Sequence, residues 1–234
     1  MKSFLAAIGF LTRIPVDAVD VTNAAGWFPL VGLLLGASDA LVAFVLRGHL
    51  PPAVIAVLLV ALDAVATGAL HFDGFADAAD GFGGGRTRDD VLRIMRDHAI
   101  GSYGGVALIL LVALKTAAYA NLLDHPAAII LTPALGRWSI LLLTATLPYA
   151  RQSASVIDGM GKRSLLWGTA IVVIALVCAR SARGWIATAT VLAVSAAFGF
   201  YCRRRINGIT GDTLGANLQL CESAALITFL WAGQ

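Results

Sequence analysis

Long apolar stretches alternate with short polar segments along almost the whole chain of 234 residues. A helix that crosses the hydrocarbon core of a bilayer, about 30 Å thick, needs about 20 predominantly apolar residues. Seven stretches approach this length, and they cover residues 27–46, 53–70, 103–123, 127–147, 165–179, 185–202 and 213–232. The pattern predicts an all-α integral membrane protein, a polytopic helix bundle with about seven transmembrane helices.

Two features refine this prediction. The fifth and sixth stretches are separated only by residues 180–183, which indicates a tight helical hairpin. Before the first stretch, residues 1–16 combine Lys2 and Arg13 with recurring apolar side chains. Such a segment is typical of a short amphipathic helix in the membrane interface, although a plain lead-in to the first span is an alternative.

The composition excludes a soluble enzyme. Apolar residues make up 59% of the chain and charged residues only 13%, whereas soluble domains carry about 25% charged residues. The net charge of +3 requires no nucleic-acid partner, because basic loops beside anionic membrane lipid account for it. No internal repeat or linker divides the sequence, so we expect a single domain over residues 1–234.

The basic residues predict an orientation. With seven spans, one side of the membrane receives most of them: Lys2, Arg13, Arg86, Arg88, Arg93, Arg96, Arg151, Lys162, Arg163, Arg203, Arg204 and Arg205. The other side receives only Arg47, Arg180 and Arg183. Because basic loops stay in the cytoplasm, we expect the N-terminus in the cytoplasm and the C-terminus outside.

Five aspartates gather in the polar segment 71–90, which lies on the predicted cytoplasmic side. If the segment is helical, spacings of four and three residues place Asp73, Asp77 and Asp80 on one face. Like charges on one face repel, and a divalent cation such as Mg²⁺ with oxygen ligands would neutralise them. The pattern predicts a metal and phosphate site, with a solvated connector as the alternative.

The residues after the aspartates favour phosphate binding. Glycines at positions 81, 83, 84 and 85 could end the helix with positive φ and let the backbone approach a phosphate. Thr87 and Asp90 have the spacing of a capping box that opens a second, amphipathic helix. The charged residues here that could contact phosphates are Arg86, Arg88, Arg96 and Asp97.

A second polar segment lies at residues 207–216, on the same predicted side of the membrane. Asp212 in this segment could approach the three aspartates, so it is a candidate substrate-binding residue. The alternative is an ordinary loop in which Asp212 or Thr213 is the N-cap of the last helix.

Four charged residues fall inside predicted spans, at Asp63, Lys115, Arg137 and Glu222. Such residues usually face a partner or a polar cavity because an isolated charge in the membrane is costly. Arg137 could bind phosphate in a bidentate manner, or it could pair with one of the acids.

Several segments together resemble the cobalamin synthase family, the adenosylcobinamide-GDP ribazoletransferases. They are residues 67–81, 94–97 and 100–104, with residues 10–16 at the start and 210–216 near the end. The resemblance implies a Mg²⁺-dependent transferase of the bacterial inner membrane. Such an enzyme joins adenosylcobinamide-GDP to α-ribazole, or its 5′-phosphate, and releases GMP.

A mechanism follows from combining this resemblance with the aspartate pattern. We hypothesise that Asp73, Asp77 and Asp80 hold Mg²⁺ against the diphosphate. One aspartate that is not fully committed to the metal, either Asp77 or Asp80, would accept the proton of the ribazole 3′-hydroxyl. Arginines of the loop would steady the phosphate oxygens.

Two other functions are consistent with parts of the sequence. A CDP-alcohol phosphotransferase uses a similar aspartate-rich helix, but it usually has Ala-Arg where this chain has Ala76-Asp77. A membrane transporter would instead use the charged residues inside the spans.

Overall fold

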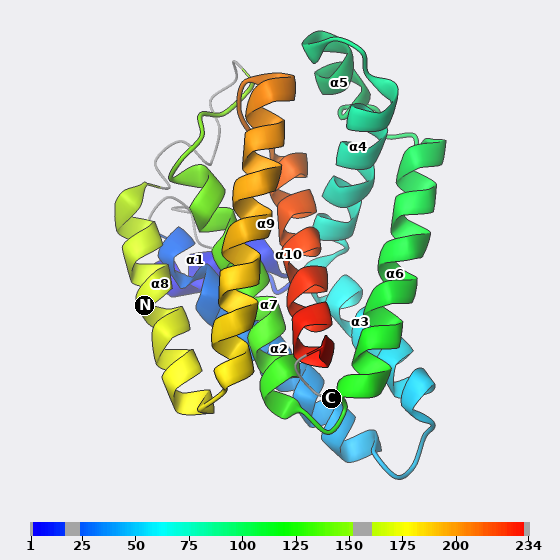
Figure 1. The fold of residues 1–234 in the computed structure, drawn as a ribbon, viewed down its shortest axis with the longest axis vertical. Coiled ribbons are helices and arrows are strands. Elements are labelled where there is room, and N and C mark those ends of the chain that lie inside the picture. Colours follow the sequence, from blue (N-terminus) through cyan, green and yellow to red (C-terminus); the bar gives the residue numbers. More distant parts are fainter. Residues whose placement is uncertain (1, 17–23, 152–160, 232–234) are drawn as a thin grey trace.

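The computed structural model describes residues 2–16, 24–151 and 161–231, which fold into a bundle of α-helices (Figure 1). The helices are α1 (Lys2–Leu11), α2 (Phe28–Leu46), α3 (Pro52–Thr67), α4 (Leu70–Gly84), α5 (Arg88–Ile94), α6 (Ser102–Leu122), α7 (Pro126–Thr144), α8 (Lys162–Ala179), α9 (Ala182–Ile206) and α10 (Gly211–Trp231). A short 3₁₀ helix, η1 (Ala25–Trp27), precedes α2. The expected all-α fold is confirmed.

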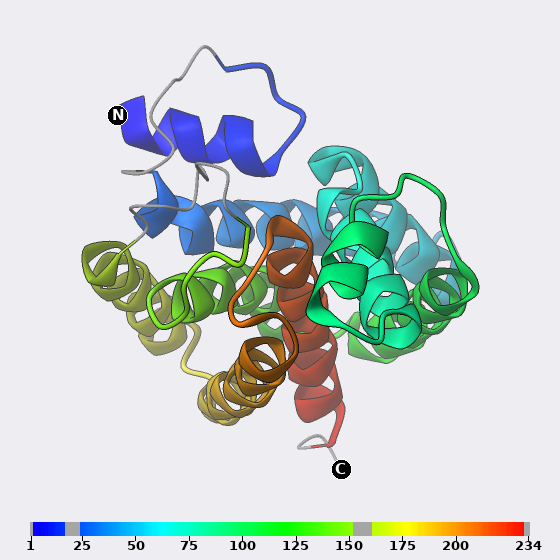
Figure 2. The same cartoon turned by 90° about the horizontal axis from the view of Figure 1, so that it is seen from above.

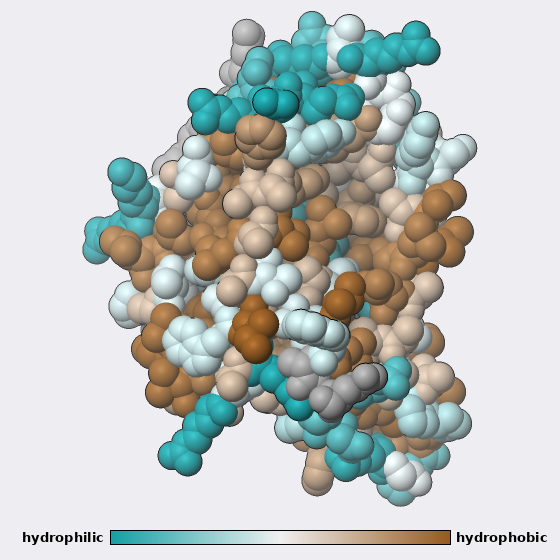
Figure 3. All heavy atoms as spheres, in the orientation of Figure 1, coloured by the Kyte–Doolittle hydropathy of each residue, from teal (hydrophilic) through white to brown (hydrophobic). Residues whose placement is uncertain are grey.

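The surface of the bundle is that of a multi-pass membrane protein. An apolar band crosses the visible face between two more polar ends (Figure 3). Large apolar side chains point outward from the helices, among them Phe44 at 75%, Ile109 at 70% and Leu166 at 72% exposure. So much exposed apolar surface would be unfavourable in water and is favourable against lipid.

Fewer helices than the seven expected spans qualify as crossings by length and apolar composition alone. Within the described residues, α2 together with η1, α6, α7, α8 and α9 qualify, while α3 and α4 pass only as a pair bent by 92°. Helix α10 is more polar, with Asn217, Gln219 and Glu222 all buried. It packs against α4, α6, α7 and α9 in the middle of the bundle, so neighbouring helices shield these polar groups from lipid.

The bend between α3 and α4 directs α4 toward one end of the bundle. Gly68 and Ala69 both adopt left-handed backbone conformations, with φ of 62° and 58°, which end α3 and start α4 in a new direction. The segment after α1 holds this corner, because the Arg13 N–H donates to the Ala66 carbonyl oxygen at 2.8 Å. The bend places the aspartate-bearing helix beside α10.

Helix α1 lies across the bundle beside α2 (Figure 2). Its outer side exposes Leu5 and Phe10, while Ala6, Ala7 and Leu11 are buried. A helix before the first span is therefore confirmed, but because apolar side chains lie on both its exposed and its buried side, its amphipathic character stays a prediction.

The loops that carry the two polar segments meet at one end of the bundle, the upper end in Figure 1. The Ile209 N–H donates to the Pro148 carbonyl oxygen at 3.0 Å, and the Ala150 N–H donates to the Ile209 carbonyl oxygen at 2.8 Å. At the same end, Arg205 of α9 donates to the Gly85 carbonyl oxygen at 2.8 Å. Both polar segments therefore lie at the same end of the bundle, while their side of the membrane stays a prediction.

Candidate active site

The three aspartates of the first polar segment lie on one helix, as their spacing predicts. Asp73, Asp77 and Asp80 all belong to α4, which is helical from Leu70 to Gly84. Their surroundings differ, because Asp73 is exposed, Asp77 is half-buried and Asp80 is buried. One helix therefore carries three carboxylates that differ in how far they are buried.

Asp212 joins them from the first turn of α10. The two helices approach closely because Gly74 and Gly215 lie at their contact. A Cβ atom at Gly74 would lie 3.0 Å from the Asp212 carbonyl oxygen, so larger residues would push the helices apart. Asp73 and Asp212 line the same cavity. We call Asp73, Asp77, Asp80 and Asp212 the carboxylate cluster.

Asp80 is already bound to the backbone of α6. Its two carboxylate oxygens accept hydrogen bonds from the N–H groups of Gly101 and Gly104, each at 2.8 Å. A Cβ atom at either glycine would collide with this carboxylate. Asp80 therefore fixes the start of α6 against α4, and it differs from Asp73 and Asp77, which accept no hydrogen bond from the described residues.

Asp212 is not the N-cap of α10. That role belongs to Thr210, whose hydroxyl accepts from the Thr213 N–H at 3.2 Å, while the Thr213 hydroxyl accepts from the Thr210 N–H at 2.8 Å. The predicted alternative of a cap at Asp212 or Thr213 is therefore wrong. The Thr210 hydroxyl also donates to the Asp212 carboxylate at 3.2 Å, so Asp212 lies beside the cap without forming it.

Arg151 is the cation that meets Asp212, with Nη2 and Oδ2 2.6 Å apart. Burial raises the pKa of Asp212 above its usual value, and the attraction of Arg151 offsets this only in part. In the sequence, Arg151 is recognisable only as a basic loop residue, because nothing local pairs it with an aspartate 61 positions later.

The glycines that follow the aspartates serve packing. Helix α4 continues through Gly84, and none of the glycines at 81, 83, 84 and 85 has a positive φ. The prediction that these glycines end the helix is confirmed, because α4 ends at Gly84 with Gly85 as its C-cap, but the expected positive φ is wrong. A Cβ atom at Gly81 would lie 2.5 Å from Met95, and one at Gly83 would lie 2.6 Å from Tyr103. Small residues here allow α5 and α6 to pack against α4.

The predicted capping box is confirmed at the start of α5. The Thr87 hydroxyl accepts from the Asp90 N–H, while the Asp90 carboxylate accepts from the Thr87 N–H. The hydrogen bond from the Thr87 hydroxyl to the Asp90 carboxylate, followed by the one from the Thr87 N–H, lowers the pKa of Asp90. The box fixes the direction in which α5 leaves the loop.

The basic residues of this loop have different environments. Arg88 donates to the carbonyl oxygens of Ile206 at 3.2 Å and Ala150 at 2.5 Å, so it ties α5 to the neighbouring loops. Arg86 and Arg96 are exposed at the same end. Asp97 is also exposed and accepts from the Ala99 N–H at 3.1 Å. All four predicted phosphate contacts are thus exposed, but the Arg88 guanidinium is already engaged by backbone carbonyl oxygens.

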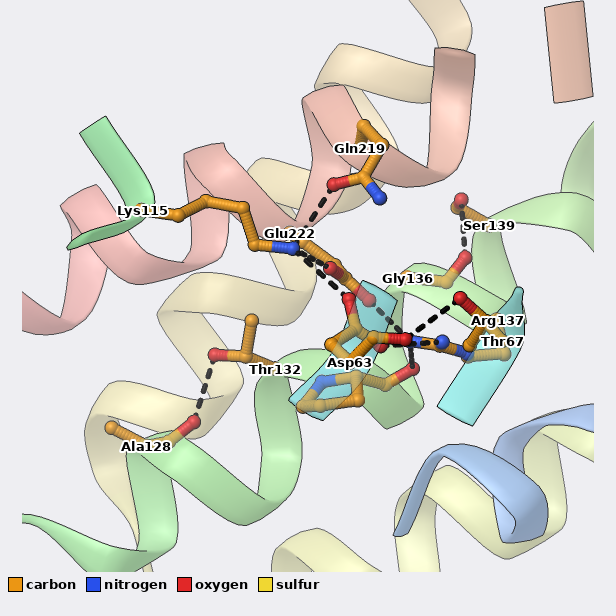
Figure 4. Close-up of polar contacts among 11 residues, drawn as sticks. Asp63, Thr67, Lys115, Ala128, Thr132, Gly136, Arg137, Ser139, Gln219 and Glu222 are labelled. Atoms are coloured by element: carbon orange, nitrogen blue, oxygen red, sulfur yellow. Dashed lines mark hydrogen bonds and ion pairs between the residues drawn. The ribbon is translucent and has the colours of Figure 1, made fainter. Parts of the chain in front are cut away.

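Arg137 lies apart from the carboxylate cluster and is fully buried (Figure 4). It pairs with Glu222 at 2.5 Å and with Asp63 at 3.1 Å. Lys115 contacts the same two acids, at 2.7 Å from Glu222 and 3.4 Å from Asp63. We call these four residues the buried ion network. Arg137 therefore pairs with the acids, which was the alternative to phosphate binding, and its guanidinium is not available to a substrate.

Among the described residues, no three His, Cys, Asp or Glu side chains form a ready-made metal cage. Mg²⁺ is commonly held by one or two carboxylates, while waters and substrate phosphates complete its coordination. Asp73 and Asp77 suit this mode because they lie one turn apart on α4 and keep their oxygens available. Asp212 approaches from the opposite helix, so the donor chemistry fits a magnesium ion shared with a bound phosphate.

Comparison with known proteins identifies the family. The family model described as cobalamin-5-phosphate synthase matches residues 3–230. The chain belongs to the cobalamin-5-phosphate synthase family. This membership favours the predicted ribazoletransferase over the CDP-alcohol phosphotransferase and the transporter.

Relatives named adenosylcobinamide-GDP ribazoletransferase match over nearly full length. A protein of Ralstonia nicotianae is 38% identical, covering 98% of this chain and 95% of the relative. One of Rhizobium etli is 39% identical, covering 94% and 93%, and one of Clostridium botulinum is 36% identical, covering 98% and 96%. No solved structure matches this chain.

Proposed function

We propose that this protein transfers the phospho-cobinamide part of adenosylcobinamide-GDP to α-ribazole or its 5′-phosphate. The products are adenosylcobalamin, or its 5′-phosphate, and GMP. The full-length family match carries this proposal. The carboxylate cluster supports it, because a diphosphate substrate requires an anionic site that can share a divalent cation with it.

We assign the cofactor Mg²⁺ to Asp73 and Asp77, with Asp212 beside them. When bound, Mg²⁺ would neutralise the diphosphate and stabilise the charge that develops on departing GMP. The cluster combines four carboxylates, and Arg151 is the cation that pairs with one of them. This excess of negative charge favours a divalent cation.

Asp77 is a better candidate for the general base than Asp80, acting through a carboxylate oxygen that is not bound to the metal. The 3′-hydroxyl oxygen of the acceptor forms a bond to the phosphorus attached to cobinamide, while the bond from that phosphorus to the GMP oxygen breaks. The hydroxyl proton passes to a carboxylate oxygen. Asp80 is less suited to this task because both its oxygens already accept backbone N–H groups.

The remaining charged residues position the reacting groups. Asp80 and Arg88 fix the loop geometry through their backbone contacts. Arg86 and Arg96 are accessible and can steady phosphate oxygens. Arg151 orients Asp212 and can exchange this partner for a phosphate oxygen.

We place the active end of the bundle in the cytoplasm and the protein in the bacterial inner membrane. The end that carries the carboxylate cluster also carries Arg86, Arg88 and Arg203–Arg205, in line with the positive-inside rule. Helix α10 runs from this end and finishes at Trp231 toward the opposite end (Figure 1). Nucleotide substrates would reach the cluster from the cytoplasm.

The direct test is GMP release by the purified protein in detergent, supplied with adenosylcobinamide-GDP, Mg²⁺ and α-ribazole 5′-phosphate. We expect GMP and adenosylcobalamin 5′-phosphate in equal amounts, and no GMP when the acceptor is omitted. A folded protein that releases no GMP, or that releases CMP from a CDP-alcohol instead, would overturn the proposed function.

A further inference from the structure

An apolar cavity of about 160 Å³ lies directly beside the carboxylate cluster. Its apolar wall comes from five helices, α1, α2, α4, α7 and α10, through Phe10, Leu11, Phe28, Leu70, Ile140 and Leu214. Three polar side chains, His71, Asp73 and Asp212, line the same cavity. The cavity therefore combines a largely apolar wall with two carboxylates and one imidazole.

Helix α1 and the start of α2 contribute an aromatic wall. The rings of Phe10 and Phe28 stack with centroids 5.6 Å apart and planes 4° from parallel. Phe28 is fully buried, whereas Phe10 is 37% exposed. Arg13 holds the end of this segment through its N–H bond to Ala66. A flat apolar ring entering the cavity would meet aromatic and branched aliphatic side chains.

The two proposed substrates carry four ring systems, which are corrin, adenine, guanine and dimethylbenzimidazole, and only the last suits this cavity. The corrin ring of cobinamide is far larger than the cavity. The adenine of the adenosyl group and the guanine of GDP carry several donors and acceptors that an apolar wall would leave unpaired, which is costly. The dimethylbenzimidazole base of α-ribazole is small, flat and almost wholly apolar. Apolar cavities of about 150 Å³ are known to bind benzene, so this size suits an aromatic base.

We infer that this cavity receives the dimethylbenzimidazole base of the acceptor and so presents the ribose hydroxyls to Asp73 and Asp212. The inference rests on the proposed function. With the base inserted between α1 and α10, the attached sugar lies at the carboxylate end. There the carboxylates can accept hydrogen bonds from its hydroxyls. The cavity thus acts as the specificity site for the acceptor base, and it borders the proposed magnesium and diphosphate site at Asp73.

Phe10→Ala tests this assignment, with Leu5→Ala as the matched control. Both residues lie on α1 and are similarly exposed, at 37% and 40%, but only Phe10 lines the cavity. Steady-state GMP release would give kcat and the KM of each substrate. We expect Phe10→Ala to raise the acceptor KM about tenfold, with the KM of adenosylcobinamide-GDP within about twofold. Leu5→Ala should change neither value.

An acceptor that carries unsubstituted benzimidazole sharpens the test. Removing two methyl groups from a buried base should raise the acceptor KM about fifteenfold in the unmodified protein. This penalty should shrink in Phe10→Ala and persist in Leu5→Ala. Phe10→Leu should fall between, and elution as a single species in detergent would verify folding of each variant.

Three outcomes would overturn the assignment, and they are distinguishable. An active parent protein with an unchanged acceptor KM in Phe10→Ala would remove the base from this cavity and leave the proposed function intact. Equal changes in both KM values that depend on the added lipid would indicate a lipid tail as the occupant. A folded parent protein that releases no GMP would remove the proposed function and this inference together.

Discussion

The carboxylate cluster and the buried ion network use charged residues in opposite ways. In the network, two acids and two bases contact one another with almost no exposure, as Lys115 and Arg137 each contact both Asp63 and Glu222. In the cluster, four carboxylates gather at the end of the bundle and Arg151 pairs with one of them.

This difference indicates that the buried ion network stabilises the bundle, whereas the carboxylate cluster binds a ligand. Charges that are paired inside the bundle hold α3, α6, α7 and α10 together, because separating either partner would leave an uncompensated charge away from water. In the carboxylate cluster, the negative charges outnumber the positive charges that pair with them. They favour a ligand that brings positive charge, which is a metal ion with its phosphate.

Asp73→Asn and Asp77→Asn are expected to give the largest effects. Each replaces an anionic oxygen with a neutral amide at nearly constant size, so turnover should fall by about a thousandfold or more. Thermal unfolding in detergent should stay close to that of the parent protein, because neither carboxylate accepts a hydrogen bond from the described residues. Near-normal GMP release in both variants would contradict the assigned site.

Arg137→Leu should act on stability. It leaves Asp63 and Glu222 short of a partner in the bundle, a loss of about 3–5 kcal/mol for breaking a buried pair. The measurement is the midpoint of thermal unfolding in detergent. Arg137→Leu combined with Glu222→Leu should recover part of the loss. A variant with normal stability but no turnover would return Arg137 to the substrate contacts that the sequence predicts.

Asp212→Asn should reduce GMP release about a hundredfold, which is typical for the loss of one directed electrostatic contact. Thr210 and Thr213 cap α10 without it, so insertion and stability should be nearly unchanged. Thr213→Ala is a useful counterpart, because it removes the cap while keeping Asp212. If the Asp212 variant kept most of its activity, the catalytic site would be confined to α4 and its loop.

Asp80→Asn should have the smallest effect, with turnover reduced about tenfold. The amide can accept only one of the two N–H groups that the carboxylate accepts, and its own N–H₂ would face the other donor. Hydrogen exchange at Gly101 and Gly104 should become faster, since the start of α6 loses an anchor. A loss as severe as that of Asp73→Asn would show that Asp80 also acts on the metal.

The sequence predicts the parts of this account that depend on neighbouring residues. Spacings of four and three put Asp73, Asp77 and Asp80 on one helix, and Thr87 with Asp90 form the expected capping box. Such patterns repeat with the helical period or lie within one turn, so they are visible without a fold.

Contacts between distant segments could not be predicted in this way. Asp80 accepts hydrogen bonds from residues 21 and 24 positions later, and Arg151 meets Asp212 across 61 positions. Either acid inside the spans could have partnered Arg137, and a phosphate could have done so as well. Only the packing of α3 and α10 around it distinguishes these choices.

The dependence of GMP release on Mg²⁺ tests most directly whether the carboxylate cluster, unlike the buried ion network, binds a metal for catalysis. The protein would be treated with EDTA and titrated with Mg²⁺, while GMP release from adenosylcobinamide-GDP and thermal unfolding are followed on the same sample. We predict no release without the metal, saturable recovery as it is added, and an unfolding midpoint that changes little. Full release in EDTA would contradict the assignment of the carboxylate cluster as a magnesium site.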